Sequence, residues 1–123
     1  MAERAVAQLL EFLQKALRAS GVRADRLIVF GSQARGTAGD ESDVDIAIIS
    51  RDYEGKDIFE RIMLAKQAVL ATAEKFVVPM DIVHLTPGEY DSGSSPLVSF
   101  VREGEEASVP TEILPGRPKT ADR

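Results

Sequence analysis

Cysteine is absent from the 123-residue chain, and histidine occurs only once, as His84. The first absence excludes disulfides, thiolate metal sites and cysteine nucleophiles, and the second excludes zinc sites built on several histidines. No apolar run approaches the roughly 20 residues that span a bilayer, and the first residues, MAERAVAQ, lack a secretory signal pattern. We therefore expect a cytoplasmic protein that has no membrane partner.

Basic residues are fewer than acidic ones. Fifteen Lys and Arg against twenty Asp and Glu give a formal net charge of −5 at pH 7. Broad binding to a nucleic-acid backbone relies on neutralising phosphates with Lys and Arg, so this balance disfavours it. A local site for a nucleotide that is held through a metal ion remains compatible with the charge.

The apolar pattern predicts an α/β fold. Residues at helical spacing indicate two long amphipathic helices and a short last helix, and short β-branched or alternating runs indicate three strands. The expected helices cover 3–19, 57–75 and 96–102, and the expected strands cover 26–30, 43–50 and 77–85. This order indicates an α/β (α+β-like) domain with a small mixed sheet of three to four strands and helices mainly on one face.

Local signals refine the element ends. Asp57 followed by Glu60 predicts a capping box at the start of the second long helix. Pro79 cannot donate a ladder hydrogen bond, so the first residues of the third strand are expected on an edge or outside the sheet. Residues 86–88, Thr-Pro-Gly, are interpreted as a turn.

The composition changes near residue 105. Three of the six prolines follow that point, and we expect no regular structure there. The predicted organisation is a domain over 1–104 and a Pro-rich tail over 105–123. Val109, Ile113 and Leu114 in this tail suit docking into a partner, and a frayed C-terminus is the simpler alternative.

A glycine-rich segment follows the first expected strand, with the sequence Gly-Ser-Gln-Ala-Arg-Gly over 31–36. A strand that ends in such a turn presents free backbone N–H groups at a helix start, and these suit phosphate oxygens. Gly31 lets a ligand approach the backbone closely, and Ser32 adds a hydroxyl donor. For Arg35, contact with a substrate phosphate and an ion pair with a neighbouring acid are equally good interpretations.

Two aspartates stand two positions apart on the second expected strand. Asp43 and Asp45 therefore point to the same face, with Cα atoms roughly 6.5 Å apart. Hard oxygen ligands beside a phosphate-binding turn suit Mg²⁺, and a pair of ions about 3.5–4 Å apart can hold both oxygens of an in-line phosphoryl displacement. The alternative is a solvated strand end that carries ordinary surface acids.

A third carboxylate, Asp81, lies among apolar residues on the third expected strand. An unpartnered carboxylate is costly to bury there, so a partner is expected. If this strand pairs with 43–50, Asp81 joins the two aspartates, where it could bind metal and accept a proton from an incoming hydroxyl. His84 follows three residues later and falls on the opposite strand face, so we expect it to be packed or surface-exposed rather than catalytic.

Taken together, the Gly-Ser turn, the Asp-x-Asp strand and the later strand aspartate resemble the motif of minimal nucleotidyltransferases, relatives of DNA polymerase β. The resemblance covers residues 5–103 in element order and motif spacing. It implies a polymerase β-like core that transfers AMP from ATP to a hydroxyl, with pyrophosphate leaving and two Mg²⁺ ions bound. It assigns catalysis and metal binding to Asp43, Asp45 and Asp81, and nucleotide binding to Gly31, Ser32 and Arg35.

The resemblance also implies a partner. Short members of this family resemble antitoxins encoded beside a HEPN-type toxin ribonuclease, which would make a tyrosine of that toxin the acceptor and leaves a hetero-oligomer open. Two alternatives stand beside this one. The acceptor could be the hydroxyl of a small molecule, or the protein could be a non-catalytic antitoxin that neutralises its partner by contact.

Overall fold

One mixed β-sheet organises the protein. The computed structural model describes residues 3–31, 43–93, 96–105 and 112–113. Within them the strands lie in the order β3-β2-β1-β4. Their bounds are Arg26–Phe30 for β1, Val44–Ile49 for β2, Met80–Leu85 for β3 and Glu112–Ile113 for β4. β2 pairs antiparallel with β1 and parallel with β3. The expected small mixed sheet is therefore confirmed.

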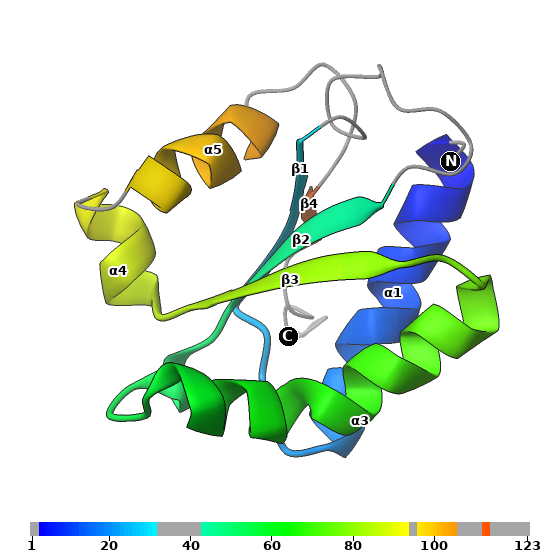
Figure 1. The fold of residues 1–123 in the computed structure, drawn as a ribbon, viewed down its shortest axis with the longest axis horizontal. Coiled ribbons are helices and arrows are strands. Elements are labelled where there is room, and N and C mark those ends of the chain that lie inside the picture. The colour runs from blue at the N-terminus through cyan, green and yellow to red at the C-terminus, as the bar shows by residue number, and fades with distance from the viewer. Residues whose placement is uncertain (1–2, 32–42, 94–95, 106–111, 114–123) are drawn as a thin grey trace, which may run out of the picture.

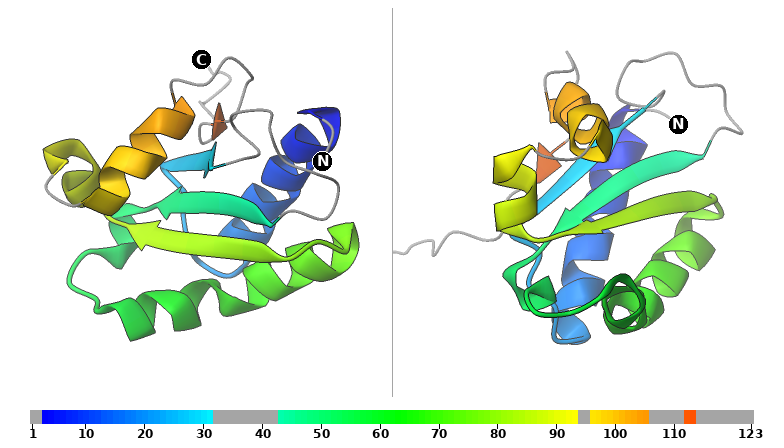
Figure 2. Two further views of the ribbon diagram at one scale, coloured as in Figure 1. Left: turned by 45° about the horizontal axis from the view of Figure 1, so that its top comes forward. Right: turned by 60° about the vertical axis from the view of Figure 1, so that its left-hand side comes forward.

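Helices cover both faces of the sheet unequally (Figures 1 and 2). The two long helices, α1 (Glu3–Ala19) and α3 (Ile58–Phe76), share one face. The two short helices, α4 (Pro87–Ser92) and α5 (Pro96–Glu105), pack on the other. A 3-10 turn, η1 (Arg51–Tyr53), leads from β2 toward α3. Among the helices that the structure describes, none combines the length and apolarity needed to cross a membrane.

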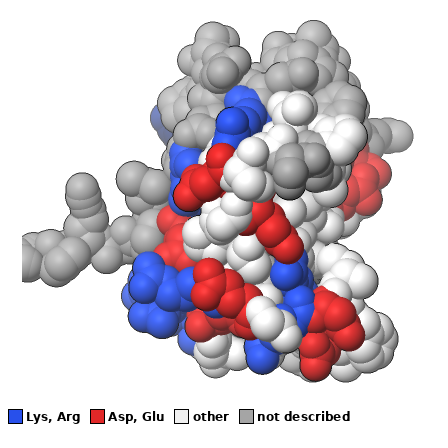
Figure 3. Space-filling view, turned by 90° about the vertical axis from the view of Figure 1, so that its left-hand side faces the viewer, with Lys and Arg blue, Asp and Glu red and all other residues white. Residues whose placement is uncertain are grey.

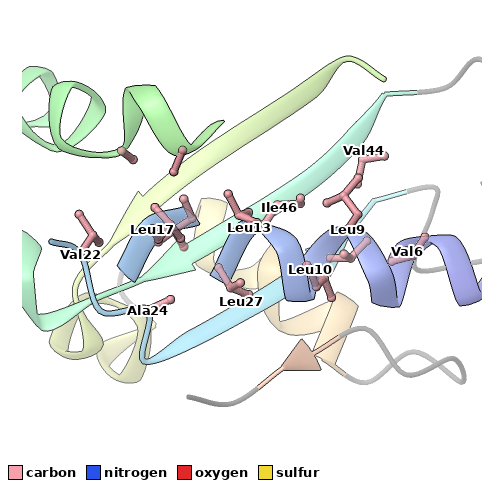
Figure 4. Packing of buried hydrophobic residues seen from close by; sticks show 14 of the residues in the cluster. Val6, Leu9, Leu10, Leu13, Leu17, Val22, Ala24, Leu27, Val44 and Ile46 are labelled. Atoms are coloured by element: carbon pink, nitrogen blue, oxygen red, sulfur yellow. The ribbon is translucent and has the colours of Figure 1, made fainter. Parts of the chain in front are cut away.

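Alternation along β2 separates two hydrophobic cores. Val44, Ile46 and Ile48 face α1 and α3, whereas Ala47 and Ile49 face α4 and α5. This is the period of two expected for a strand that is buried on both sides. In the larger core, apolar side chains of α1 pack on the sheet (Figure 4). They include Leu9, Leu10, Leu13 and Leu17, which lie near Leu27 and Ile46. The helical spacing in the first residues of the chain is therefore confirmed as an amphipathic helix.

The capping box of α3 is present as predicted. The Asp57 carboxylate accepts a hydrogen bond from the Glu60 N–H at 2.8 Å, and the Glu60 carboxylate accepts one from the Asp57 N–H at 2.9 Å. At the other end Val77 takes a left-handed conformation, with φ 51°, and ends the helix. β3 then begins at Met80, which confirms that Pro79 lies outside the strand.

Two local predictions were wrong. Residues 86–88 are not a simple turn, because Thr86 caps α4 in a second capping box and Pro87 takes its first turn. The Thr86 hydroxyl accepts from the Glu89 N–H at 3.0 Å, and the Glu89 carboxylate accepts from the Thr86 N–H at 2.9 Å. In the expected tail, β4 pairs with β1 through Leu27↔Ile113 and Ile28↔Glu112. Regular structure therefore continues beyond residue 105.

The Tyr90 ring on α4 and Arg102 on α5 link the two short helices to each other. The guanidinium carbons of Arg26 and Arg102 lie over the Tyr90 ring, 5.0 and 5.3 Å from its centroid. Arg102 also donates to the carbonyl oxygens of Tyr90 at 2.6 Å and of Asp91 at 2.8 Å, near the end of α4. These contacts hold α5 against α4 and so keep both over the same face of the sheet.

A buried polar pair links η1 to β3. The Tyr53 hydroxyl lies 2.8 Å from Nδ1 of His84, and both residues are buried. Burial lowers the pKa of His84 to about 4, with nearby Arg61 contributing, and it raises the pKa of Tyr53. Near pH 7 a neutral imidazole and a protonated tyrosine therefore share this hydrogen bond. His84 lies on the face opposite to Asp81 and is packed, as the sequence predicted.

The depressed pKa of His84 predicts a pH-dependent stability. Its ordinary value is 6.5, so below that pH the unfolded chain binds a proton that the folded chain refuses until about pH 4. Stability is therefore fully present above pH 6.5 and falls as the pH drops; we expect a loss of about 1–2 kcal/mol between pH 7 and 5. Urea unfolding at a series of pH values measures it.

His84→Gln is the matched variant, since glutamine retains a hydrogen-bonding side chain and does not titrate. Asp25 and Glu89 also have lowered pKa values, but their ordinary values of 3.8 and 4.5 restrict their effect to more acidic solutions. Between pH 7 and 5 the variant should show a flatter dependence than the parent chain. Identical slopes would show that His84 titrates normally in the folded protein.

Candidate active site

Strand pairing brings the end of β1 beside the starts of β2 and β3. Phe30 pairs with Asp45 across the antiparallel ladder, and Asp45 pairs with Asp81 across the parallel one. Neighbouring strands lie about 4.8 Å apart, and residues in register point to the same face. The structure therefore brings two of the three predicted acidic residues directly side by side.

The acids share the face that carries α4 and α5. Asp45 alternates with Ala47 and Ile49, which pack under these helices, and Asp81 alternates with Val83 on the same side. Asp45 is half-buried, whereas Asp81 is exposed. Asp43 directly precedes β2, two positions before Asp45, and is exposed. Asp45 and Asp81 therefore lie at one end of one sheet face, and Asp43 lies at the same end, just before β2.

Gly31 makes room for one of these carboxylates. It follows β1 with φ 74°, a left-handed conformation that favours glycine. A Cβ atom at this position would overlap the Oδ2 atom of Asp45. The sequence predicted that Gly31 lets a ligand approach the backbone. It did not reveal the contact between Gly31 and Asp45, because that contact depends on the pairing of β1 with β2.

The other two predicted nucleotide contacts, Ser32 and Arg35, lie outside the described residues. The phosphate-binding role of this turn therefore stays a prediction. The structure describes the residues on either side of this turn. Gly31 is the last described residue before it, and Asp43 is the first described residue after it.

The donor set fits a hard divalent cation. Among the residues that the structure describes, no group of three or more His, Cys, Asp and Glu is placed to hold a metal ion. Mg²⁺, however, is usually bound by one or two carboxylates together with substrate phosphates and water. The neighbouring carboxylates of Asp45 and Asp81 are the kind of pair that such a site uses, and Asp43 lies close by in the chain.

The opposite end of the sheet has a different electrostatic character. Acidic and basic side chains interleave there (Figure 3), and several form ion pairs with each other. Arg51 contacts Asp25 at 2.7 Å, and Arg61 contacts Glu89 at 2.8 Å. At that end these charges are matched within the fold.

Comparison with known proteins identifies the family of this chain. Residues 6–107 match a family whose description is nucleotidyltransferase domain. A Methanocaldococcus jannaschii protein named "putative protein adenylyltransferase" is 30% identical over 95 residues. The aligned part covers 76% of this chain and 64% of that protein, so the chain matches somewhat less than two thirds of the relative's length.

Two solved structures share the fold. One is described as a "putative nucleotidyltransferase" from Sulfolobus solfataricus; it is 19% identical, with a TM-score of 0.56, and the match covers 96% of this chain and 86% of that one. The other is described as a "putative minimal nucleotidyltransferase"; it is 24% identical, with a TM-score of 0.56, and the match covers 89% of this chain and 96% of that one.

The Gly31–Asp45 contact leads to a prediction with a built-in control. Gly31→Ala and Gly21→Ala both force alanine into a left-handed conformation, which costs about 1–2 kcal/mol. Only the first also collides with a side chain, because nothing lies within 4 Å of a Cβ at Gly21. We expect Mg²⁺ with ATP to raise the melting temperature of the parent chain and of Gly21→Ala, but not that of Gly31→Ala. If the melting temperatures of both variants rise equally, the position of the Asp45 carboxylate does not matter for binding.

Proposed function

The chain belongs to the nucleotidyltransferase domain family, and from this membership we propose that it uses Mg²⁺ to transfer AMP from ATP to a hydroxyl group of a partner protein. One observation carries the proposal. The register of β2 with its two neighbours sets Asp45 beside Asp81 and places both next to the end of β1. Support for a protein acceptor comes from the name of the Methanocaldococcus jannaschii relative.

In this proposal the acidic residues hold the metal. Asp45 and Asp81 would bind Mg²⁺, with Asp43 supplying a further carboxylate. When bound, Mg²⁺ neutralises charge on the phosphate oxygens during the displacement. The Gly31–Ser32 backbone would bind phosphate oxygens through its N–H groups, and Arg35 would contact either a phosphate or a neighbouring acid.

The proposed reaction has one bond-forming and one bond-breaking event. The acceptor hydroxyl oxygen bonds to the α-phosphorus of ATP, the bond from that phosphorus to the bridging oxygen breaks, and pyrophosphate leaves. The Asp81 carboxylate accepts the hydroxyl proton. Its exposed position suits this role, because an incoming acceptor can reach it from solvent.

The acceptor we propose is a tyrosine of a HEPN-type toxin ribonuclease, with this protein as the antitoxin. The resemblance of the motif to such antitoxins supports it. A small-molecule hydroxyl is the alternative acceptor, and neutralisation by contact alone is the alternative mode of action. The two modes differ in whether the partner gains mass.

The first test is transfer of label from α-labelled ATP in the presence of Mg²⁺. We expect the parent protein to label a co-encoded partner, and mass spectrometry should show an added AMP on a tyrosine. Asp45→Asn should lower the rate at least about 100-fold, because it removes a metal-binding carboxylate from the paired acids.

Asp91→Asn is the matched control for this test. Asp91 is an exposed residue at the end of α4, so its change should leave labelling intact. If Asp45→Asn labels the partner as well as the parent does, the proposed metal site is wrong. If neither protein labels it and both still neutralise it, the protein acts by contact.

Asp81→Asn tests the proton-acceptor role separately. We expect turnover to fall about 10²–10⁴-fold while the affinity for ATP changes little, because proton transfer matters only in the chemical step. Single-turnover rates and equilibrium ATP binding measure the two quantities. Equal losses in both would limit Asp81 to holding the metal or the fold.

A further inference from the structure

α3 is apolar on two opposite faces. Its inner face carries Ala65 and Ala68, which are buried in the larger core. Its outer face carries four large apolar side chains that are 45–67% exposed. At 100° per residue these side chains and one lysine fall within a single stripe. We call it the outer stripe, and it comprises Phe59, Ile62, Met63, Lys66 and Leu70.

This outer stripe is unusual for a surface helix. Surface helices normally place polar residues on the side away from the core, and a helix that is apolar all round is normally covered. α1 follows the rule, since Glu11, Lys15 and Arg18 are exposed on its outer side. The exposed apolar side chains of α3 are therefore a local feature rather than a consequence of overall composition.

Two hollows border the outer stripe. One, of about 350 Å³, is lined by Phe59, Glu60 and Met63 in the first half of α3. The other, of about 270 Å³, lies between α3 and β3, where Ile62 and Leu70 face Met80 and Ile82. Ridges and hollows on one helix face are what a second helix needs in order to pack.

We propose that a second copy of this chain occupies this surface, with the two α3 helices packed antiparallel about a two-fold axis. Such an isologous contact uses the same patch on both copies. An axis near the middle of the outer stripe places Phe59 of one copy against Leu70 of the other. Met63 then lies against the Lys66 side chain of the other copy, whose aliphatic stem covers apolar surface.

The helix dipoles favour this orientation. An antiparallel pair sets the N-terminus of each α3 near the C-terminus of the other, so the two helix dipoles oppose each other. A parallel pair would set like ends of the two dipoles side by side.

The apolar area also matches self-association. Half-exposed side chains of this size leave roughly 400–500 Å² of apolar surface open, within the range of about 300–600 Å² for the largest apolar patch on a protein surface, which is often functional. Stable interfaces bury about 800 Å² on each partner, of which a little over half is apolar. The outer stripe supplies the apolar part, and the flanking charged residues supply the rim.

This contact leaves the candidate active site open. α3 packs on the face of the sheet opposite to the one that carries Asp45 and Asp81. The contact therefore does not cover Asp45 or Asp81 of either copy. The dimer is independent of the proposed reaction, and a catalytically inactive chain should form it equally well.

Sedimentation equilibrium of the full chain tests the proposal. We expect a concentration-dependent species of about twice the 13.4 kDa chain mass. Met63→Arg should raise the dissociation constant tenfold or more, because it sets an arginine against Lys66 of the other copy at two equivalent places. Leu97→Arg, on α5 and on the other side of the sheet, is the matched control and should leave the dimer intact.

Phe59→Ala supports the same test without adding charge, and circular dichroism checks that each variant is folded. Phe59→Ala should raise the dissociation constant of the dimer, as Met63→Arg does. A parent chain that stays monomeric at all concentrations overturns the proposal and assigns the outer stripe to a different partner. A dimer that both variants leave unchanged overturns it too.

The absence of cysteine allows the orientation to be tested directly. Lys66→Cys places a single thiol near the proposed axis, so a short bismaleimide should link two copies in high yield. Ser99→Cys, exposed on α5, is the control and should give little linked product. Equal yields from the two variants would contradict the antiparallel packing of α3.

Discussion

The pairing of β2 with both of its neighbours is the constraint on which the candidate site depends. β1 runs antiparallel to it and delivers Phe30 and Gly31 to its start, whereas β3 runs parallel and delivers Asp81. Buried residues on both faces of the sheet hold this register. A shift of one position would point Ile46 toward the core under α4 and α5, and Ala47 toward the core under α1 and α3. Packing that has no chemical role thus determines where the acids meet.

The two faces of the sheet have different roles. The face under α1 and α3 holds the larger core and the buried Tyr53–His84 pair, and it carries none of the proposed chemistry. The other face is covered over part of its length by α4 and α5 and carries the acids at one end. A polar reaction and a large apolar core can therefore coexist in a short chain, since they are separated by the thickness of one sheet.

Much of this arrangement could be predicted from sequence, because long elements carry a repeated signal. The helical spacing of α1, the alternation in β2 and the Asp57–Glu60 capping box each identified their element. β4 could not be predicted, since two residues contain no periodicity and only their pairing with β1 makes them a strand. α4 was missed although Thr86 and Glu89 form a capping box, because Pro87 and Gly88 between them also suit a turn. The contact of Gly31 with Asp45 depends on residues far apart in the chain, which no local pattern records.

The short connection between α3 and β3 has a consequence for how this chain can vary in length. Val77 ends the helix in a left-handed conformation, the Val78 N–H donates to the Ala73 carbonyl, and the Pro79 carbonyl accepts from the Val44 N–H. Each of the three residues is therefore held by its backbone conformation or by a hydrogen bond, and the connection contains no spare residue. An insertion or deletion of one residue here would be absorbed by sliding β3, which would exchange its inward and outward side chains. Homologues that keep an acid at the position of Asp81 should therefore tolerate gaps in their surface loops far more readily than in these three residues.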